Sequence, residues 1–135
     1  MRYWGLDILV CLYCKRFPLE LYVIEEEKQN VEVTGIETPL CKSFCGYLRG
    51  NIQQGKTYPC YECLKIAIKT AVLYCPDCRH WYPVRDGVVV MLVDSKRKLD
   101  KDREFLEKYR EKIPEFILRE GKPVNLSQTT QQPHQ

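Results

Sequence analysis

The sequence predicts an α+β fold, in which a small antiparallel sheet carries an inserted helical hairpin and a C-terminal helix. Three observations lead to this prediction. Two Cys-x-x-Cys pairs stand far apart, an apolar stretch rich in aromatic or β-branched residues follows each pair, and a charged stretch near the C-terminus has helical periodicity. A chain of 135 residues has only a modest core, so we also expect staples that add to its stability.

Cysteine is the most unusual part of the composition. The eight cysteines form four pairs; the first and the last have Cys-x-x-Cys spacing in predicted turns, and the third has the same spacing in a predicted helix. Each turn places two sulfurs on one side, so two such turns together make a tetrahedral cage that suits zinc. We predict one structural Zn²⁺ in a zinc-ribbon-like sheet, held by Cys11, Cys14, Cys75 and Cys78. An iron centre or redox thiols are the alternatives, and four sulfur ligands leave no position for a catalytic water.

The predicted strands follow the two turns. Residues 17–24 come after the first turn, residues 31–36 give one more short strand, and residues 81–84 come after the second turn. Asp86-Gly87 predicts a hairpin turn, which leads into an apolar strand over residues 88–93.

Helical patterns occupy the middle of the chain and its C-terminal third. Thr38-Pro39 is typical of a helix start, and we predict one helix from there to Gly50 and another from Pro59 to about Tyr74. They form an inserted hairpin over residues 38–73, within a discontinuous zinc-binding domain of residues 1–37 and 74–121. Residues 96–112 predict an amphipathic helix, and a short turn follows from Pro114 to Gly121. The glutamine-rich residues 122–135 predict a disordered tail.

The other four cysteines fall on the predicted hairpin. Cys41 and Cys45 share one helical face, and Cys60 and Cys63 share another. In an antiparallel hairpin the residues nearest the loop meet, which predicts the disulfides Cys45–Cys60 and Cys41–Cys63. A second metal site and reduced core cysteines remain alternatives, because bond geometry decides among them.

Composition disfavours several functional classes. The net charge of +3 is too small for the electrostatic footprint of a dedicated nucleic-acid binder. The N-terminus lacks a signal-peptide cleavage site, and no apolar run approaches the roughly 20 residues of a membrane span, so we expect a cytoplasmic protein with no membrane contact. We find no nucleophile, general base or phosphate-binding motif; of the two histidines, His134 lies in the tail, and His80 is interpreted as a surface or strand-end residue and not as a ligand.

Both cysteine turns and the strand after the second one resemble a known family. The resemblance is carried by Cys11-Leu12-Tyr13-Cys14, by Cys75-Pro76-Asp77-Cys78 and above all by Trp81-Tyr82-Pro83-Val84-Arg85-Asp86-Gly87 with the apolar strand ending in Met91-Leu92. These stretches resemble the small zinc-binding activator subunit of tRNA, rRNA and release-factor methyltransferases. The likeness covers residues 1–24 and 74–95, and the cysteines of the insertion depart from it. It implies a non-catalytic protein that forms heterodimers with S-adenosylmethionine-dependent methyltransferases and keeps each soluble and active.

The strand after Asp86-Gly87 is the predicted partner-binding surface. It is apolar on both faces, and a chain this small has little with which to cover both. An exposed edge or face of this kind is typical of partner binding by strand addition or patch burial. We therefore expect a methyltransferase to contact Val88, Val89, Val90, Met91, Leu92 and Val93. The alternative is that the C-terminal helix covers this strand as core.

Two further functional hypotheses come from other residues. Lys15, Arg16, Arg79, Arg85 and the basic residues 96–98 suggest a nucleic-acid-binding zinc ribbon, but residues 94–120 contain nine basic and eight acidic residues, which indicates a mixed, solvated face. We therefore expect contact with nucleic acid only indirectly, through the partner. The other hypothesis is a redox enzyme that uses one of the cysteine sets, and no further motif supports it.

Overall fold

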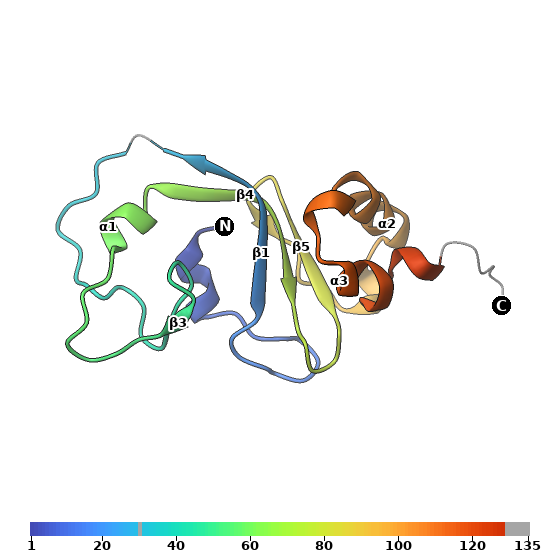
Figure 1. Cartoon of the computed structure of the whole chain (residues 1–135), viewed down its shortest axis with the longest axis horizontal. Coiled ribbons are helices and arrows are strands. Elements are labelled where there is room, and N and C mark those ends of the chain that lie inside the picture. The colour runs from blue at the N-terminus through green and yellow to red at the C-terminus, as the bar shows by residue number, and fades with distance from the viewer. Residues whose placement is uncertain (30, 129–135) are drawn as a thin grey trace.

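A four-stranded antiparallel sheet forms the middle of the molecule in the computed structural model, which describes residues 1–29 and 31–128. Its strands lie in the order β1-β4-β5-β6 (Figure 1), with bounds β1 Glu20–Lys28, β4 Ile66–Tyr74, β5 Trp81–Arg85 and β6 Val88–Val89. Helices α2 (Leu99–Lys108) and α3 (Glu115–Glu120) follow the sheet in sequence. The predicted α+β class, the antiparallel sheet and the C-terminal helix are confirmed.

Strand β4 lies between β1 and β5, and its place in the chain corrects the prediction of a helix from Pro59 to Tyr74. Only α1 (Cys60–Cys63) is helical in that stretch. Because β4 is buried on both faces, its apolar residues form an almost continuous run, which fits the period of a helix as well as that of a strand. This run misled the prediction. Its β-branched residues at positions 66, 68, 70 and 72 alternate as a strand requires.

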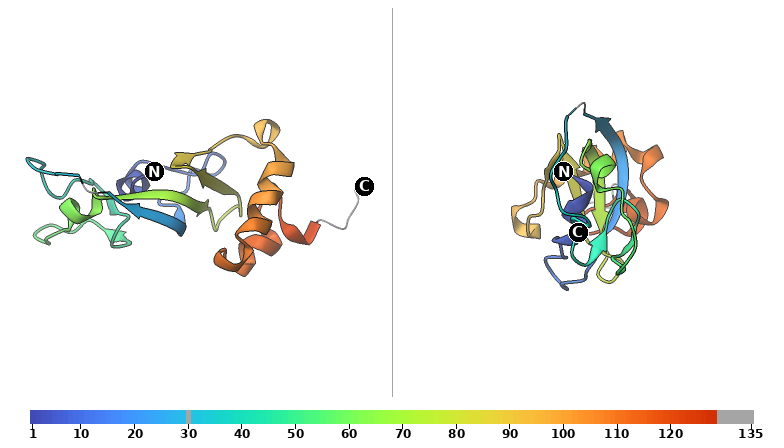
Figure 2. Two further views of the ribbon diagram at one scale, coloured as in Figure 1. Left: turned by 90° about the horizontal axis from the view of Figure 1, so that it is seen from above. Right: turned by 90° about the vertical axis from the view of Figure 1, so that its left-hand side faces the viewer.

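The two faces of the sheet are covered by different parts of the chain. On one face Val72, Tyr74 and Trp81 pack against α2 and α3 in a core that also includes Phe105, Leu106, Ile113, Ile117, Leu118 and Val124. On the other face Leu21, Leu73 and Tyr82 pack against the N-terminal 3₁₀-helix η1 (Tyr3–Asp7) and the loop that carries Cys11. We call this cluster on the N-terminal side the first core and the cluster under the helices the second core. Figure 2 shows the helices at one end of the molecule and the N-terminal segment on the opposite face of the sheet.

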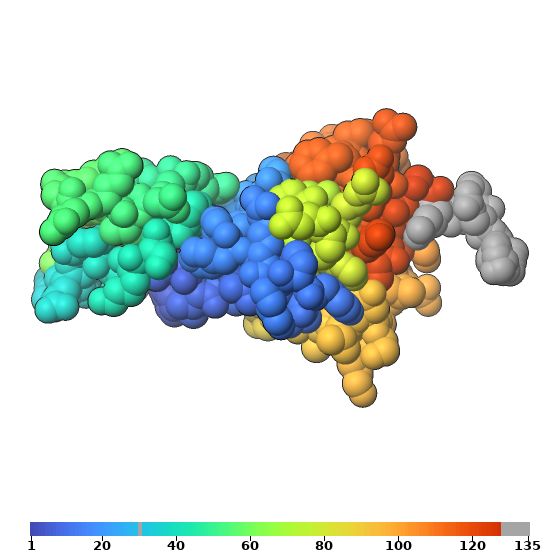
Figure 3. All heavy atoms as spheres, turned by 90° about the horizontal axis from the view of Figure 1, so that it is seen from below, coloured from blue at the N-terminus to red at the C-terminus, as the bar shows by residue number. Residues whose placement is uncertain are grey.

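The inserted segment, residues 31–65 between β1 and β4, is mostly irregular and forms the end of the molecule opposite the C-terminal helices (Figure 3). It contains a two-stranded hairpin, β2 (Phe44–Cys45) and β3 (Gly50–Asn51), and then α1. The predicted helix from Thr38 to Gly50 is therefore wrong, as is the strand over residues 31–36. One reason is that the Asp7 carboxylate accepts hydrogen bonds from the backbone N–H groups of Lys42, Ser43 and Phe44, each at 2.8 Å, and so holds them out of a helix.

The beginning of the predicted disordered tail is instead part of the core. Val124 is fully buried, its carbonyl oxygen accepts a 2.8 Å hydrogen bond from Nε1 of Trp81, and Asn125 is buried beside it. The 3₁₀-helix η4 (Leu126–Gln128) follows. Polar composition misled the prediction, because the few apolar residues here have a partner that lies far away in sequence. Residues 129–135 of the predicted tail lie outside the described residues.

Close packing of the β2–β3 hairpin on η1 gives a first testable prediction. A Cβ atom on Gly46 would lie 2.3 Å from the carbonyl oxygen of Tyr3 and 2.9 Å from Cδ1 of Leu6. Gly46→Ala should therefore lower the free energy of unfolding in urea by about 1–3 kcal/mol, as expected of overpacking. Gly50→Ala is the control, because a Cβ there meets nothing within 4 Å; equal effects of the two substitutions would contradict the close packing.

Within residues 1–29 and 31–128, no helix is long and apolar enough to cross a membrane.

Candidate metal centre and partner-binding edge

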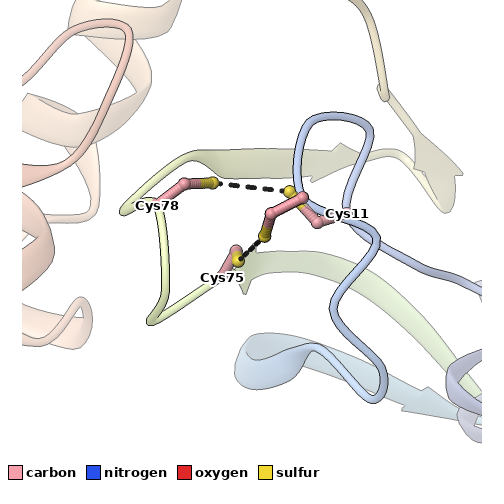
Figure 4. Close-up of side chains that lie close together, drawn as sticks. Cys11, Cys75 and Cys78 are labelled. Carbon is pink, nitrogen blue, oxygen red and sulfur yellow. Dashed lines mark hydrogen bonds between the residues drawn. The ribbon is translucent and has the colours of Figure 1, made fainter.

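The four cysteines of the two Cys-x-x-Cys turns meet at one end of the sheet, and we call them the central quartet. Cys11 and Cys14 lie on the loop between η1 and β1, and Cys75 and Cys78 lie on the turn between β4 and β5. Figure 4 shows Cys11 on one loop facing Cys78 on the other, with Cys75 on the same turn as Cys78. The sulfurs of Cys11 and Cys78 are 3.5 Å apart, and those of Cys14 and Cys75 are 3.1 Å apart. All four sulfurs lie within 4.8 Å of one another.

Backbone geometry brings the two sulfurs of each turn to the same side. The N–H of Lys15 donates to the carbonyl of Cys11 at 3.1 Å, and the N–H of Arg79 donates to the carbonyl of Cys75 at 2.8 Å. Lys15 and Arg79 have positive φ angles of 61° and 68°. In each turn this residue follows the second cysteine, and its left-handed conformation turns the chain back. The two turns are therefore built alike, although they are far apart in sequence.

Tyr82 and the backbone control the charge of Cys11. The Tyr82 hydroxyl lies 3.4 Å from Sγ of Cys11 and accepts a hydrogen bond from the N–H of Leu12 at 3.3 Å. Burial by itself would raise the pKa of Cys11, but hydrogen bonds from the Cys14 backbone, the Tyr82 hydroxyl and the Tyr13 backbone outweigh it and lower the pKa to about 6. Burial raises the pKa values of Cys75 and Cys78. A bound dication reverses that effect, because it stabilises thiolates.

The donor set fits a single zinc ion. A tetrahedron with Zn–S bonds of about 2.3 Å has S–S edges of roughly 3.8 Å, which lies between the 3.1 and 3.5 Å contacts and the 4.8 Å within which all four sulfurs fall. Cys11 and Cys75 are fully buried, whereas Cys14 is exposed, which places the site at the rim of the first core. The predicted grouping of these four residues into a cluster that can hold a metal ion is thus confirmed.

Tyr82 and Asp94 make contacts near the quartet that sequence reasoning did not identify, and His80, which it placed at the surface or at a strand end, contacts Asp94. His80 is buried, stacks on Tyr13 with ring centroids 4.1 Å apart and lies 3.1 Å from the Asp94 carboxylate through its Nε2. The N–H of Asp94 in turn donates to the Tyr13 hydroxyl at 2.7 Å. His80 thus directly precedes β5 and forms an isolated bridge with Lys122, so the interpretation of a strand-end position was correct, whereas that of a surface position was not. The sequence signal that could have predicted the burial of His80 was its position between the second cysteine turn and the following strand.

Residues 88–93, which we call the apolar edge, form one side of the sheet after the turn at Asp86-Gly87. Both turn residues have positive φ angles, 49° and 81°, as the two central residues of a type I′ hairpin do. Among the residues that the structure describes, strand β6 pairs with β5 alone, and the N–H of Val90 extends this pairing to the carbonyl of Pro83 at 2.9 Å. Val89 and Met91 pack against the first core, but Val88, Leu92 and Val93 are 61%, 42% and 44% exposed. The C-terminal helices cover the opposite face of the sheet and leave this edge open.

The other four cysteines, which we call the distal cysteines, are Cys41, Cys45, Cys60 and Cys63. They are free thiols, like the cysteines of the central quartet, so the predicted disulfides Cys45–Cys60 and Cys41–Cys63 do not form in this structure. That pairing assumed two antiparallel helices, which are absent from this part of the chain. The structure nevertheless gathers all four side chains around one small cavity.

Comparison with protein families identifies the chain. Residues 6–87, more than half of the sequence, match the model of the Trm112p-like protein family. The matched segment includes the central quartet and the Asp86-Gly87 turn and ends where the apolar edge begins. Comparison with curated proteins finds no match. The chain belongs to the Trm112p-like protein family, whose members are non-catalytic activator subunits of methyltransferases.

Proposed function

We propose that this chain forms heterodimers with S-adenosylmethionine-dependent methyltransferases that act on tRNA, rRNA or a translation release factor, and that it binds them through the apolar edge. The exposure of Val88, Leu92 and Val93 beside a strand that pairs on one side only is the observation that carries the proposal. A strand of the partner can add to this edge and shield the apolar side chains from water. In this proposal the methyltransferase carries the catalytic residues, and this chain stabilises the methyltransferase.

The central quartet has a structural part in this proposal. A single Zn²⁺ bound by Cys11, Cys14, Cys75 and Cys78 joins the loop before β1 to the turn before β5. Four thiolate ligands complete a tetrahedral shell, so the ion has no open position for substrate. The same turn leads into β5 and then into the apolar edge. We infer that the ion fixes the strand that presents the partner-binding residues.

The charges of the chain support protein binding over direct nucleic-acid binding. Arg16 pairs with Asp77 at 2.9 Å, Arg79 with Glu120 at 3.8 Å and Arg85 with Asp102 at 2.9 Å. Arg97 is buried and pairs with Asp102 as well. Basic groups that already have carboxylate partners contribute little to phosphate binding, because that binding depends on Lys and Arg side chains that are free to neutralise phosphate charges. Any contact with RNA is therefore made mainly through the methyltransferase.

Leu92→Glu tests the apolar edge. This substitution should weaken co-purification with the methyltransferase at least about tenfold, because a carboxylate would be buried without a partner at the interface. Val31→Glu is the matched control, since Val31 is equally exposed at 42% and lies in the inserted segment. The measurement is co-expression with methyltransferases of the same cell and quantification of the enzyme retained on the tagged chain.

Two controls make the outcome decisive. The zinc content and the melting temperature of Leu92→Glu should match those of the unaltered chain, because Leu92 is exposed and belongs to no cluster of buried residues in the described part of the chain. Retention of the enzyme by Leu92→Glu at the level seen for Val31→Glu would refute the assignment of the apolar edge. Failure of the unaltered chain to retain any methyltransferase would refute the proposed heterodimer itself.

A further inference from the structure

The inserted segment has too small a core to account for its own order. One small cluster of buried residues, Cys45, Tyr58 and Cys60, lies within it, with partly buried Ile36, Leu40, Tyr47 and Ile52 around them, and the side chain of Cys63 is buried as well. Long irregular segments without regular structure are uncommon in ordered domains, because little burial offsets their conformational entropy. Three of these four buried side chains are cysteines, which points to a cross-link as the missing stabilisation.

We propose that the distal cysteines, Cys41, Cys45, Cys60 and Cys63, bind a second structural Zn²⁺ ion that orders the inserted segment. These four side chains line one cavity of about 10 Å³ together with Trp4, Leu40, Gly46, Tyr47, Tyr58 and Pro59. The sulfurs come from two separate stretches, as they do in the central quartet. Four thiol ligands favour a tetrahedral site for zinc.

The turn at Cys45 has the same backbone construction as the two turns of the central quartet. The N–H of Arg49 donates to the carbonyl of Cys45 at 2.7 Å, and Arg49 has a positive φ angle of 61°. Lys15 and Arg79 occupy the corresponding positions after Cys11 and Cys75, four residues on in each case. The chain therefore uses one type of cysteine turn three times, twice for the central quartet and once in the inserted segment.

Backbone amides already point at two of the distal sulfurs. The N–H of Leu48 lies 3.4 Å from Sγ of Cys45, and the N–H of Leu40 lies 3.4 Å from Sγ of Cys60. In the central quartet the N–H of Tyr13 makes the same contact with Cys11 at 3.4 Å. Such donors stabilise a negatively charged thiolate more than a neutral thiol. Cys60 and Cys63 supply their sulfurs from a single turn, α1, whose N-terminal residue is Cys60.

The distal thiols also influence one another electrostatically. Burial, followed by the charges of Cys45, Cys41 and Cys60, raises the pKa of Cys63 to about 12. Burial, with Asp7 and the neighbouring cysteines, raises the pKa of Cys41 to about 11. A dication removes this mutual repulsion and displaces the protons on binding. Within residues 1–29 and 31–128, the central quartet alone has all its ligand atoms within 4.8 Å, so the distal sulfurs draw closer around their ion.

Metal stoichiometry tests the proposal on the full chain. Purified protein should contain two zinc ions per chain, and Cys60→Ser/Cys63→Ser should contain one. Glu62→Ser is the matched control, because Glu62 lies on the same turn between the two cysteines and is exposed; it should retain two. Cys14→Ser, which removes a ligand of the central quartet, should also lower the content by one.

Thiol counting and cobalt titration separate the alternatives without any variant. If zinc is bound, the denatured and chelated chain should show all eight thiols, and titration with Co²⁺ should saturate the thiolate absorbance at two equivalents. Four thiols would mean two disulfides and would overturn the proposal. One metal ion per chain with eight thiols would overturn it as well, because the distal cysteines would then be reduced core residues. An iron centre in place of the second zinc would be revealed by its colour and would have the same consequence.

Discussion

Cys75→Ser should unfold the part of the chain that contains the sheet. Cys75 is fully buried and supplies one of four ligands, and the free energy of metal binding is also free energy of folding in small zinc domains. Apparent binding energies of about 10–16 kcal/mol are as large as the whole stability of an ordinary domain, about 5–15 kcal/mol. We therefore expect loss of the cooperative thermal transition, measured by circular dichroism, and the release of one zinc ion.

Asp77→Ser is the control for this experiment. Asp77 lies on the same turn, between Cys75 and Cys78, and pairs with Arg16 through a side chain that is 57% exposed. Surface ion pairs of this kind contribute only about 0–1 kcal/mol, so the melting temperature should change little. Removal of metal from the unaltered chain with a chelator should reproduce the effect of Cys75→Ser. A chelated chain that keeps its melting temperature would show that the sheet is stable without the ion.

Asp102→Ala should cost about 3–5 kcal/mol of unfolding free energy, because it leaves a buried arginine without its ion-pair partner. The Asp102 carboxylate accepts a hydrogen bond from Nε of Arg97 at 2.8 Å and another from Arg85 at 2.9 Å. The Arg97 side chain is only 1% exposed and also donates to the carbonyl of Trp81 at 2.5 Å, with its guanidinium over the indole ring. This cluster joins α2 to β5.

Asp100→Ala is the matched control for the buried ion pair. Asp100 stands in the same first turn of α2, so both substitutions remove the same favourable interaction with the helix dipole. Its side chain is fully exposed and lies 3.9 Å from Arg103, so little change is expected. Urea unfolding of the two variants measures the difference. Equal urea midpoints for Asp102→Ala and Asp100→Ala would mean that the buried Arg97 is stabilised without Asp102.

Some features could be predicted because short-range chemistry specifies them. The two Cys-x-x-Cys turns each place their sulfurs by backbone geometry alone, and Asp86-Gly87 provides two residues that tolerate positive φ. The C-terminal helix was predicted over residues 96–112 and is observed as α2, Leu99–Lys108, because its apolar residues recur at helical spacing. The exposed apolar edge was also predicted, although regular strand pairing there is confined to Val88–Val89.

Other predictions were wrong because contacts between residues that are far apart in sequence decide the structure there. Residues 66–74 became the strand β4 since β1 and β5 pair with it on both sides, and an isolated helical pattern carries no information on such neighbours. Asp7 holds the backbone at Lys42–Phe44 through a contact with another part of the chain. Val124 is buried because its side chain packs in the same core as Trp81, which also donates to its carbonyl. None of these partners is visible in the local sequence.

The sequence by itself determined which residues can hold a metal ion and which segment is apolar enough to bind a partner. Both properties depend on residue type and on spacing within a few positions. Only the tertiary structure decided that the central quartet converges, that Tyr82 touches Cys11, and that the distal cysteines surround one cavity. The physical reason is that these contacts depend on how the sheet brings distant loops together, and strand pairing is a property of the whole chain.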